Sequence, residues 1–304
     1  MKQWLYTLVA LLVGLPALHA QVNAELVLDQ EQFLPQESLP VGVRITNLSG
    51  KTLRFDTNTQ WLRFSVEAYE GIVVNQIAEM PRPEPFTLPT AKRATTIVDL
   101  AACFGFETPG RYRVTAILNI PDWDPVVVTP VIKFDIVNGL RVWDQLFGLP
   151  PKENDPGQPP ARKYILQKVN TMKEIRLYVR LTNPEETKTF QVFRLCPMVS
   201  FAQPAAQVDK DANLHVLCQT GARAFMYHVL SSNGELIRRM TYDYANTRPA
   251  LTSNGEGDYR VTGGKRRATP DDFAPTPDLP GPKIVTPAPT DAPDAKKKKK
   301  KDDW

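Results

Sequence analysis

Residues 110–120 read GRYRVTAILNI, and in this stretch apolar residues recur at every second position. The residues that share one face are Tyr112, Val114, Ala116 and Leu118. Successive side chains of a β-strand point to opposite sides, so a period of two indicates a strand with one buried face. The stretch therefore predicts a half-buried strand and makes an all-β fold the first expectation.

The same alternation recurs on both sides of this strand. Residues 39–46, 61–68 and 131–137 alternate in the same way, and turn residues such as 47–50 (NLSG) separate the runs. Several short strands at this spacing are typical of a β-sandwich, whose two inner faces form one core. We therefore predict a first sandwich domain over residues 24–138.

Three runs within this domain resemble a known class of module. They are FLPQE at 33–37, VRITNLSG at 43–50 and PGRYRV at 109–114. Together they resemble the immunoglobulin-like β-sandwich modules of secreted bacterial proteins, over the N-terminal half of the chain only. The resemblance implies that the Tyr112 ring packs at a corner and that its hydroxyl bonds to the backbone. It implies a fold rather than a function, because this fold serves many purposes.

A second β-rich unit is predicted over residues 163–264. Residues 173–182 (KEIRLYVRLT) alternate, with Leu177 and Val179 on the apolar face and Arg176 and Tyr178 on the other. Turn residues then separate strand-like runs at 213–219, 223–230 and 235–243. This pattern predicts a second antiparallel β-domain, either a small sandwich or an open barrel.

Residues 139–162 are predicted to form a proline-rich joint between the two domains. Residues 141–149 (RVWDQLFGL) fit either a short helix or an extended strap that docks Trp143 and Phe147. Five prolines follow, at 150, 151, 156, 159 and 160, with polar residues between them. Such a composition makes a stiff linker.

Residues 265–304 form a low-complexity tail that we predict to be disordered. Prolines alternate with Asp, Ala and Thr, and the tail then ends in a lysine run followed by DDW. Such a segment buries too little apolar surface to offset the entropy of ordering. The lysine run is the candidate contact for an anionic polymer, with a solvated tail as the alternative; its residues are Lys296, Lys297, Lys298, Lys299, Lys300 and Lys301.

The net charge of +4 belongs to the ends of the chain. Ten basic and seven acidic residues fall in 265–304, and Lys2 adds one positive charge, which leaves residues 21–264 with 26 of each sign. A nucleic-acid footprint would need clustered Lys and Arg in the folded body. The charge pattern therefore argues against specific binding of nucleic acid.

Residues 1–20 (MKQWLYTLVALLVGLPALHA) are predicted to be a secretory signal peptide. Lys2 supplies the positive start, an apolar run follows, and small residues allow cleavage after Ala20 or after Ala24. An uncleaved anchor is the alternative, although the apolar run is short for a membrane span. We expect export to the periplasm or the extracellular space, with no membrane span after processing.

The chain has three cysteines, Cys103, Cys196 and Cys218. In an oxidising compartment they allow one intramolecular disulfide and leave one thiol over. Cys196–Cys218 is the predicted pair. The alternative is that all three are small buried hydrophobic residues.

The histidines that remain after processing, His215 and His228, are the candidate chemistry of the second domain. If Thr220 and Gly221 form a two-residue turn, the two histidines become diagonal neighbours on one strand face. A metal pair is then conceivable, with half-exposed strand histidines as the alternative. Asp209-Lys-Asp211-Ala-Asn213 also begins like a calcium loop, yet it lacks the glycine and the glutamate that such a loop needs. A polar turn is the simpler interpretation of that run.

Taken together, these patterns predict an exported, non-catalytic binding or structural protein of the cell envelope or extracellular space. Its β-domains would present surfaces to a protein or polysaccharide partner, and no cofactor is expected. The basic tail would add weak attachment to anionic polymers. The alternative is an enzyme or enzyme accessory that acts on extracellular polymers, with its site around His215 and His228.

Overall fold

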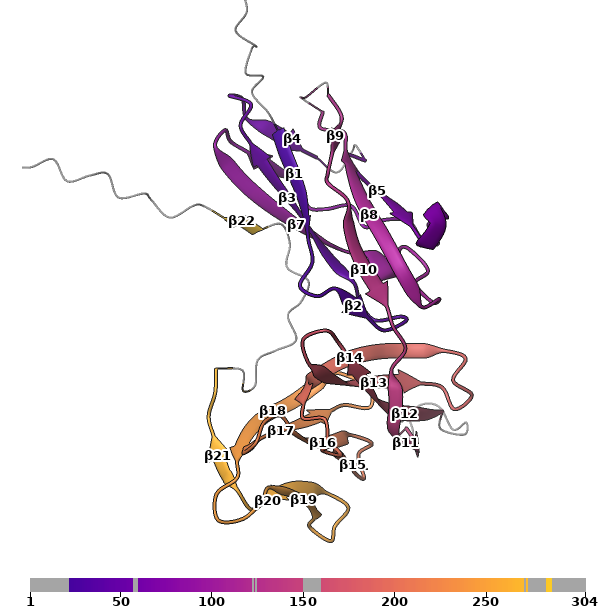
Figure 1. The fold of residues 1–304 in the computed structure, drawn as a ribbon, viewed down its shortest axis with the longest axis vertical. Helices are drawn as coiled ribbons and strands as arrows, with labels where there is room; N and C mark the ends of the chain where they lie inside the picture. The colour runs from indigo at the N-terminus through magenta and orange to yellow at the C-terminus, as the bar shows by residue number, and fades with distance from the viewer. Residues whose placement is uncertain are drawn as a thin grey trace, which may run out of the picture.

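The computed structural model describes residues 22–56, 60–121, 123, 125–149, 160–270, 272 and 283–285. Within these residues the chain is built from strands and two short 3-10 helices, η1 (Tyr69–Gly71) and η2 (Leu100–Ala102), which confirms the all-β prediction. The strands form two groups, one above the other in Figure 1. The predicted signal peptide, residues 1–20, and the lysine run, residues 296–301, lie outside the described residues.

None of the helices in the described part of the chain is both long and apolar enough to cross a membrane.

The first domain contains two main sheets (Figure 1). One has the order β1-β3-β7-β22, with β1 (Val22–Val27), β3 (Pro40–Asn47), β7 (Lys92–Asp99) and β22 (Lys283–Val285). The other has the order β2-β10-β8-β5, with β2 (Gln32–Phe33), β10 (Ile132–Ile136), β8 (Gly110–Leu118) and β5 (Leu62–Glu67). The short β9 (Val127–Val128) pairs with β8, and β4 (Leu53–Phe55) pairs with β6 (Phe86–Leu88). All pairs are antiparallel except β2 with β10.

Both sheets of the first domain contribute to one apolar core. Val43 and Ile45 of β3 are fully buried in the same cluster as Val114 and Leu118 of β8. The alternation of residues 110–120 is therefore the inner face of a strand, as predicted. The Tyr112 ring also lies in this core, and its hydroxyl donates a 2.7 Å hydrogen bond to the carbonyl oxygen of Thr108.

The second domain is also made of two sheets that share a core. The first has the order β11-β12-β13-β14, with β11 (Leu140–Gly148), β12 (Ala161–Asn170), β13 (Ile175–Thr182) and β14 (Thr189–Met198). The second has the order β15-β16-β17-β18-β21, with β15 (Ala205–Val208), β16 (Leu214–Gln219), β17 (Ala224–Leu230), β18 (Leu236–Asp243) and β21 (Lys265–Arg267). A separate hairpin joins β19 (Ala250–Ser253) to β20 (Tyr259–Thr262). Leu177 and Val179 of one sheet share a buried cluster with Val216 of the other. Of the two predicted alternatives, the second domain is therefore a small sandwich and not an open barrel.

The predicted joint, residues 139–162, is corrected by the structure. Residues 140–148 are neither a helix nor a strap but the edge strand β11, which pairs along its length with β12. Only Phe147 of this strand is buried, so the strand shows little of the alternation that marks a strand with one buried face. The second domain thus begins near Leu140, and residues 150–159 of the joint lie outside the described residues.

The domain end at residue 264 is corrected as well. β21 extends the second domain past that point by pairing with β18. β22 pairs with β7 of the first domain, so two short parts of the predicted disordered tail, residues 265–267 and 283–285, are strands. Most of the rest of 265–304 lies outside the described residues, and the prediction of disorder there stays a prediction.

The two domains meet where the turn after β2 packs on the outer face of β12–β14. The Leu34 side chain is 1% exposed and lies in a cluster with Val169, Tyr178 and Val192. Arg180 Nη2 donates a 2.9 Å hydrogen bond to the carbonyl oxygen of Pro35 in the same turn. The contact between the domains thus combines an inserted apolar side chain with charged hydrogen bonds.

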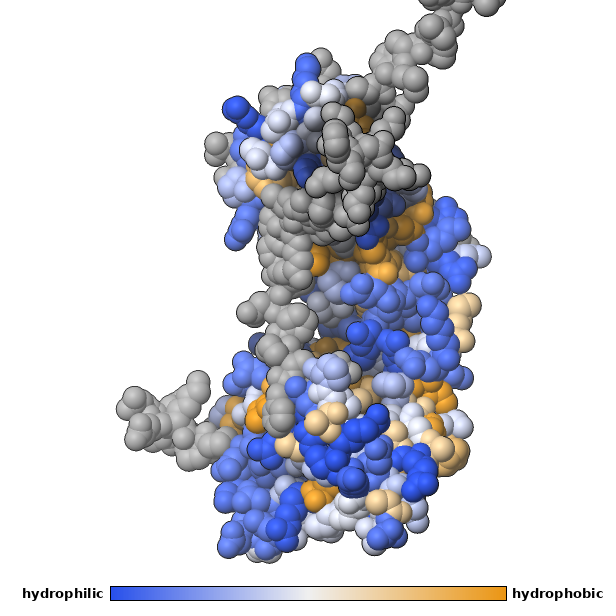
Figure 2. Space-filling view, turned by 90° about the vertical axis from the view of Figure 1, so that its left-hand side faces the viewer, coloured by the Kyte–Doolittle hydropathy of each residue, from blue (hydrophilic) through white to orange (hydrophobic). Residues whose placement is uncertain are grey.

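Away from this contact, the side of the molecule turned to the viewer in Figure 2 is mainly hydrophilic over the second domain, with apolar residues scattered among the polar ones. Scattered apolar residues of this kind are normal on a protein surface and mark no site by themselves. Hollows and buried polar clusters are therefore the candidate sites.

Candidate functional site

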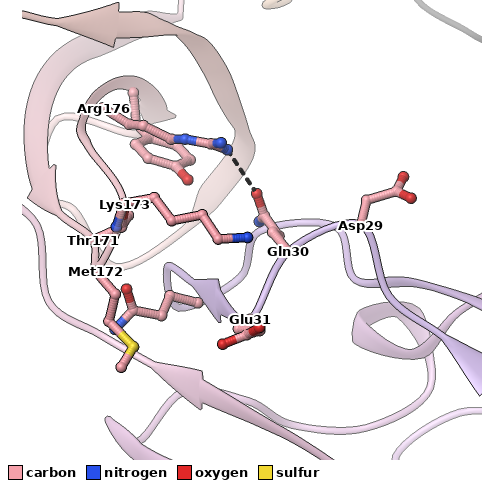
Figure 3. A pocket seen from close by; sticks show the side chains of 9 residues that line it. Asp29, Gln30, Glu31, Thr171, Met172, Lys173 and Arg176 are labelled. Atoms are coloured by element: carbon pink, nitrogen blue, oxygen red, sulfur yellow. Dashed lines mark hydrogen bonds between the residues drawn. The ribbon is translucent and has the colours of Figure 1, made fainter.

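A pocket lies at the contact between the domains (Figure 3). The first domain supplies residues 29–32, and the second supplies the turn at residues 171–173 with Arg176 and Tyr178 of β13. The turn is held by Thr171, whose backbone N–H donates to the carbonyl oxygen of Glu174 at 2.9 Å. We call this hollow the joint pocket.

Gln30 is the central polar side chain of the joint pocket. Its amide oxygen accepts hydrogen bonds from the guanidinium groups of Arg176 and Arg194, and its amide nitrogen donates to Glu37 Oε1 at 2.9 Å. Figure 3 shows Lys173 and Arg176 of the second domain extending toward Gln30 of the first. One amide thus links a carboxyl group of the first domain to two cations of the second.

The carboxyl group of Glu37 is buried behind this amide. Glu37 Oε2 accepts a 2.8 Å hydrogen bond from the backbone N–H of Leu34, which closes the turn that carries Leu34 into the second domain. Burial raises the pKa of Glu37 to about 7, against the opposing effect of the hydrogen bonds and of the positive charges on Arg194 and Arg176. Glu37 therefore changes charge near neutral pH at the point where the domains touch.

The rim of the joint pocket is exposed and carries both signs of charge. Met172 is 84% exposed, Lys173 follows it in the chain, and Asp29 and Glu31 of the first domain also line the pocket. The hollow is open to solvent, and the space of about 440 Å³ within it includes open solvent. Donors and acceptors on facing walls suit a polar segment that offers both kinds of group.

The sequence-predicted pairing of His215 with His228 is wrong. The turn between β16 and β17 is longer than two residues, because the backbone N–H groups of Thr220 and Gly221 both donate to the carbonyl oxygen of Ala224. His215 therefore lies opposite Val229, and His228 lies opposite Val216. An odd change of register moves a side chain to the other face of a sheet, so the two histidines point in opposite directions.

Neither histidine is half-exposed, contrary to the alternative prediction. His215 is 7% exposed, and both its ring nitrogens are engaged: Nδ1 lies 2.6 Å from the Tyr227 hydroxyl oxygen, and Nε2 lies 2.9 Å from Asp209 Oδ2. His228 is 1% exposed, and its ring lies near the backbone of Leu195. Burial, with a smaller effect from the charge of Arg239, lowers the pKa of His228 to about 3.

The candidate metal residue Asp211 joins an acidic cluster that does not include either histidine. Within the described ranges, the group of potential metal ligands whose donor atoms all lie within 4.8 Å of one another is Asp209, Asp211 and Asp258. Asp209 already accepts hydrogen bonds from the backbone N–H groups of Asp211, at 2.9 Å, and Asn213, at 2.7 Å. Its second oxygen accepts from the Asn213 side chain and contacts His215. These bonds occupy both carboxylate oxygens, as in the polar turn that the sequence analysis favoured.

The charges of this acidic cluster are also balanced from within the protein. Lys210 Nζ lies 3.2 Å from Asp258 Oδ2. Burial acts to raise the pKa of Asp209, but the hydrogen bonds from His215 and Asn213 outweigh it and hold the pKa below its usual value. We conclude that the cluster organises the turn before β16.

The predicted cysteine pair is brought together as two neighbouring thiols. Cys196 of β14 and Cys218 of β16 are buried in the same core. The neighbouring Cys218 thiol and burial raise the pKa of Cys196. Cys103 is buried in the other domain. All three are free thiols in the structure, so the disulfide stays a prediction.

Sequence reasoning missed the residues that make the joint pocket. Gln30, Leu34 and Glu37 lie in one short loop, and nothing in their order distinguishes them from an ordinary exposed loop. The usable signal is weak: the exposed-looking face of β13 carries Tyr178 between Arg176 and Arg180, and a large ring there is better suited to a covered face. The anionic-polymer candidates, residues 296–301, lie outside the described residues.

Comparison with known proteins identifies no family for this chain. No protein-family model matches it, and no curated protein matches it. Among solved structures, it is similar to the sporulation control protein Spo0M from Bacillus subtilis, with 8% identity and a TM-score of 0.28. The similarity covers 57% of this chain and 89% of that chain. At this level of likeness it carries no argument about function.

Proposed function

We propose that this protein is an exported, non-catalytic binding protein of the cell envelope or extracellular space, and that its joint pocket holds a polar segment of a protein or polysaccharide partner. The observation that carries the proposal is the pocket itself. Both domains line it, with Asp29 and Glu31 from the first domain and Lys173 from the second. A ligand seated there would contact both domains at once, which favours a partner over a purely structural role.

The wider assignment rests on the sequence. The run at residues 1–20 supports export, and the resemblance of residues 24–138 supports an immunoglobulin-like first domain. The hydrogen bond from the Tyr112 hydroxyl to the backbone of Thr108 agrees with that resemblance. In this proposal the lysine run, residues 296–301, adds weak attachment to anionic polymers that salt would screen.

The alternative of an enzyme with its site in the second domain gains no support from His215. A general base needs a free nitrogen within reach of a substrate proton. Both nitrogens of His215 are occupied by Tyr227 and Asp209, and the ring is buried. This cluster stabilises the turn and strands it joins.

The proposal is tested by binding of the full-length protein to two immobilised probes. One is bacterial envelope polysaccharide washed free of protein, and the other is solubilised envelope protein. We expect the double variant Met172→Ala, Lys173→Glu to lose at least about tenfold in affinity for one probe, because both side chains lie on the exposed rim. A loss of this size corresponds to about 1.4 kcal/mol.

The matched control is Arg260→Glu, which reverses an exposed charge on β20, outside the residues that line the pocket. It should leave binding unchanged. Equal binding by the wild type and the pocket variant, or no binding of the wild type to either probe, would overturn the proposal.

A further inference from the structure

The two thiols of the second-domain core come from different sheets. Cys196 lies on β14 of the sheet β11–β14, and Cys218 lies on β16 of the facing sheet. Both side chains lie in the same apolar cluster, and they are 3% and 0% exposed. A covalent bond between the two sulfur atoms would connect the two sheets through the core.

The backbones around the two cysteines are also held close together. The backbone N–H of Val199 donates a 3.1 Å hydrogen bond to the carbonyl oxygen of Gln219, one residue beyond Cys218. The Cys218 thiol lies 4.0 Å from the carbonyl oxygen of Pro197, the residue after Cys196. A disulfide needs Cα atoms about 4.4–6.8 Å apart and side chains that point toward each other. These two contacts hold the strand ends that carry the cysteines next to each other.

A metal site is the competing explanation of paired thiols, and the geometry does not favour it. A structural zinc site takes four ligands. In the part of the chain that the structure describes, the thiols are not in a group of three or more ligand atoms within 4.8 Å of one another, although His228 lies in the same domain. Each thiol therefore has the other as its neighbour, and among the described residues no third metal ligand joins them.

We propose that Cys196 and Cys218 form an inter-sheet disulfide in the exported protein. The inference rests on the export part of the proposed function, because an oxidising compartment is needed for such a bond to persist. The two thiols lose two protons and two electrons as the S–S bond forms. A disulfide-containing oxidant, such as glutathione disulfide, takes up the electrons and is reduced to two thiols.

The bond forms while the second domain folds. Both sulfur atoms are buried in the finished core, so an oxidant reaches them only before the two sheets close. The disulfide then closes a loop of about 20 residues that contains β15, and it restricts the unfolded chain. The result is a second domain whose stability depends on redox conditions.

The first test is a thiol count on the full-length protein refolded in a glutathione redox buffer. The protein is then denatured and alkylated without reduction, and its intact mass is measured. We expect one alkylated thiol, at Cys103, and a disulfide-linked pair of peptides that contain Cys196 and Cys218. Three alkylated thiols, or a bond that involves Cys103, would overturn the inference.

The second test compares the melting temperature with and without dithiothreitol. The wild type and the control variant Cys103→Ala should each lose roughly 5–10 °C on reduction. The double variant Cys196→Ala, Cys218→Ala should not respond. If the first test finds one alkylated thiol but the melting temperature of the wild type does not change on reduction, the disulfide does not stabilise the domain.

Both tests use refolded protein and so do not depend on secretion. N-terminal sequencing of the secreted protein tests export separately, because cleavage after Ala20 or Ala24 would show processing. Failure of export with a bonded pair in vitro would overturn the proposed location, whereas unbonded thiols in a processed protein would overturn the disulfide.

Discussion

The two domains are built alike from paired sheets, but they bury different chemistry. The core of the first domain is a continuous apolar cluster in which the rings of Phe106, Tyr112 and Phe134 lie within 5.5 Å of one another, centre to centre. The second domain buries His215 and His228 in addition to its apolar residues. The core cluster of the first domain contains the Cys103 thiol but no histidine among the described residues, whereas the second domain buries two histidines.

This difference predicts how each domain responds to its surroundings. Burial of apolar surface does not change with pH, so the stability of the first core should be constant across the range in which histidines titrate. His228, whose pKa burial lowers, binds fewer protons in the folded protein than in the unfolded chain. The second domain should therefore lose stability as pH falls.

The largest effect is expected from Phe134→Ala. The ring is 1% exposed and packs against Phe33, Phe106 and Tyr112. Its removal leaves a cavity and should lower the free energy of unfolding of the first domain by about 3–5 kcal/mol. Urea unfolding at pH 7.5 and pH 5 measures this loss. A loss that differed by more than about 1 kcal/mol between the two pH values would show that the stability of the first core also depends on pH.

A smaller effect is expected from the titration of His228. Its pKa of about 3 in the folded state lies below the ordinary value of 6.5, so the folded state binds fewer protons and stability falls as pH drops below 6.5. Between pH 7.5 and pH 5 the second domain should lose about 2 kcal/mol. In His228→Leu that dependence should disappear, and stability at pH 5 should rise above that of the wild type.

Met226→Leu is the matched control for His228, because it changes a neighbouring core side chain without removing a titratable group. It should keep the pH dependence of the wild type. Urea midpoints across pH 4.5–8 measure both variants, and an undiminished acid sensitivity in His228→Leu would assign the effect to another group.

The smallest effect is expected at the contact between the domains, with the opposite sign. The pKa of Glu37 is raised from 4.5 to about 7, so the folded state binds more protons and the stabilisation is lost as pH rises through 7. Docking of the domains should weaken by up to about 2 kcal/mol between pH 5 and pH 8, because deprotonation leaves a charge on the buried Glu37 carboxyl group. Glu37→Gln should flatten this dependence.

The measurement for Glu37 is the rate of amide hydrogen exchange at Val169 and Tyr178, which the turn around Leu34 covers. In the wild type, exchange corrected for the intrinsic pH effect should be faster at pH 8 than at pH 5. An identical pH dependence in Glu37→Gln would show that another group is the sensitive one.

Much of the fold could be predicted from the sequence, because half-buried strands carry their own pattern. The alternation around Val114 and around Leu177 marked inner faces that the structure confirms. The edge strand β11 was missed because only Phe147 of its nine residues is buried. A strand that buries few side chains does not show the alternation of apolar and polar residues by which a strand is recognised in the sequence.

The candidate site could be predicted only in part. The proximity of Cys196 to Cys218 was predicted, since both fall in strands of one domain. The pairing of His215 with His228 was not, because it depended on the length of one turn. An odd change of register reverses which face a side chain occupies, so a small error in the turn displaced the whole proposed pair.

The sequence by itself determined which residues of β13 share a face. Leu177 and Val179 on one side and Arg176 and Tyr178 on the other follow from the period of two alone. Only the tertiary structure decided that the polar-looking side is also covered. There the turn around Leu34 buries Tyr178 and places Gln30 against Arg176. Strand period is a local property of the backbone, whereas the cover over a face comes from a segment more than a hundred residues away, and no local pattern records that contact.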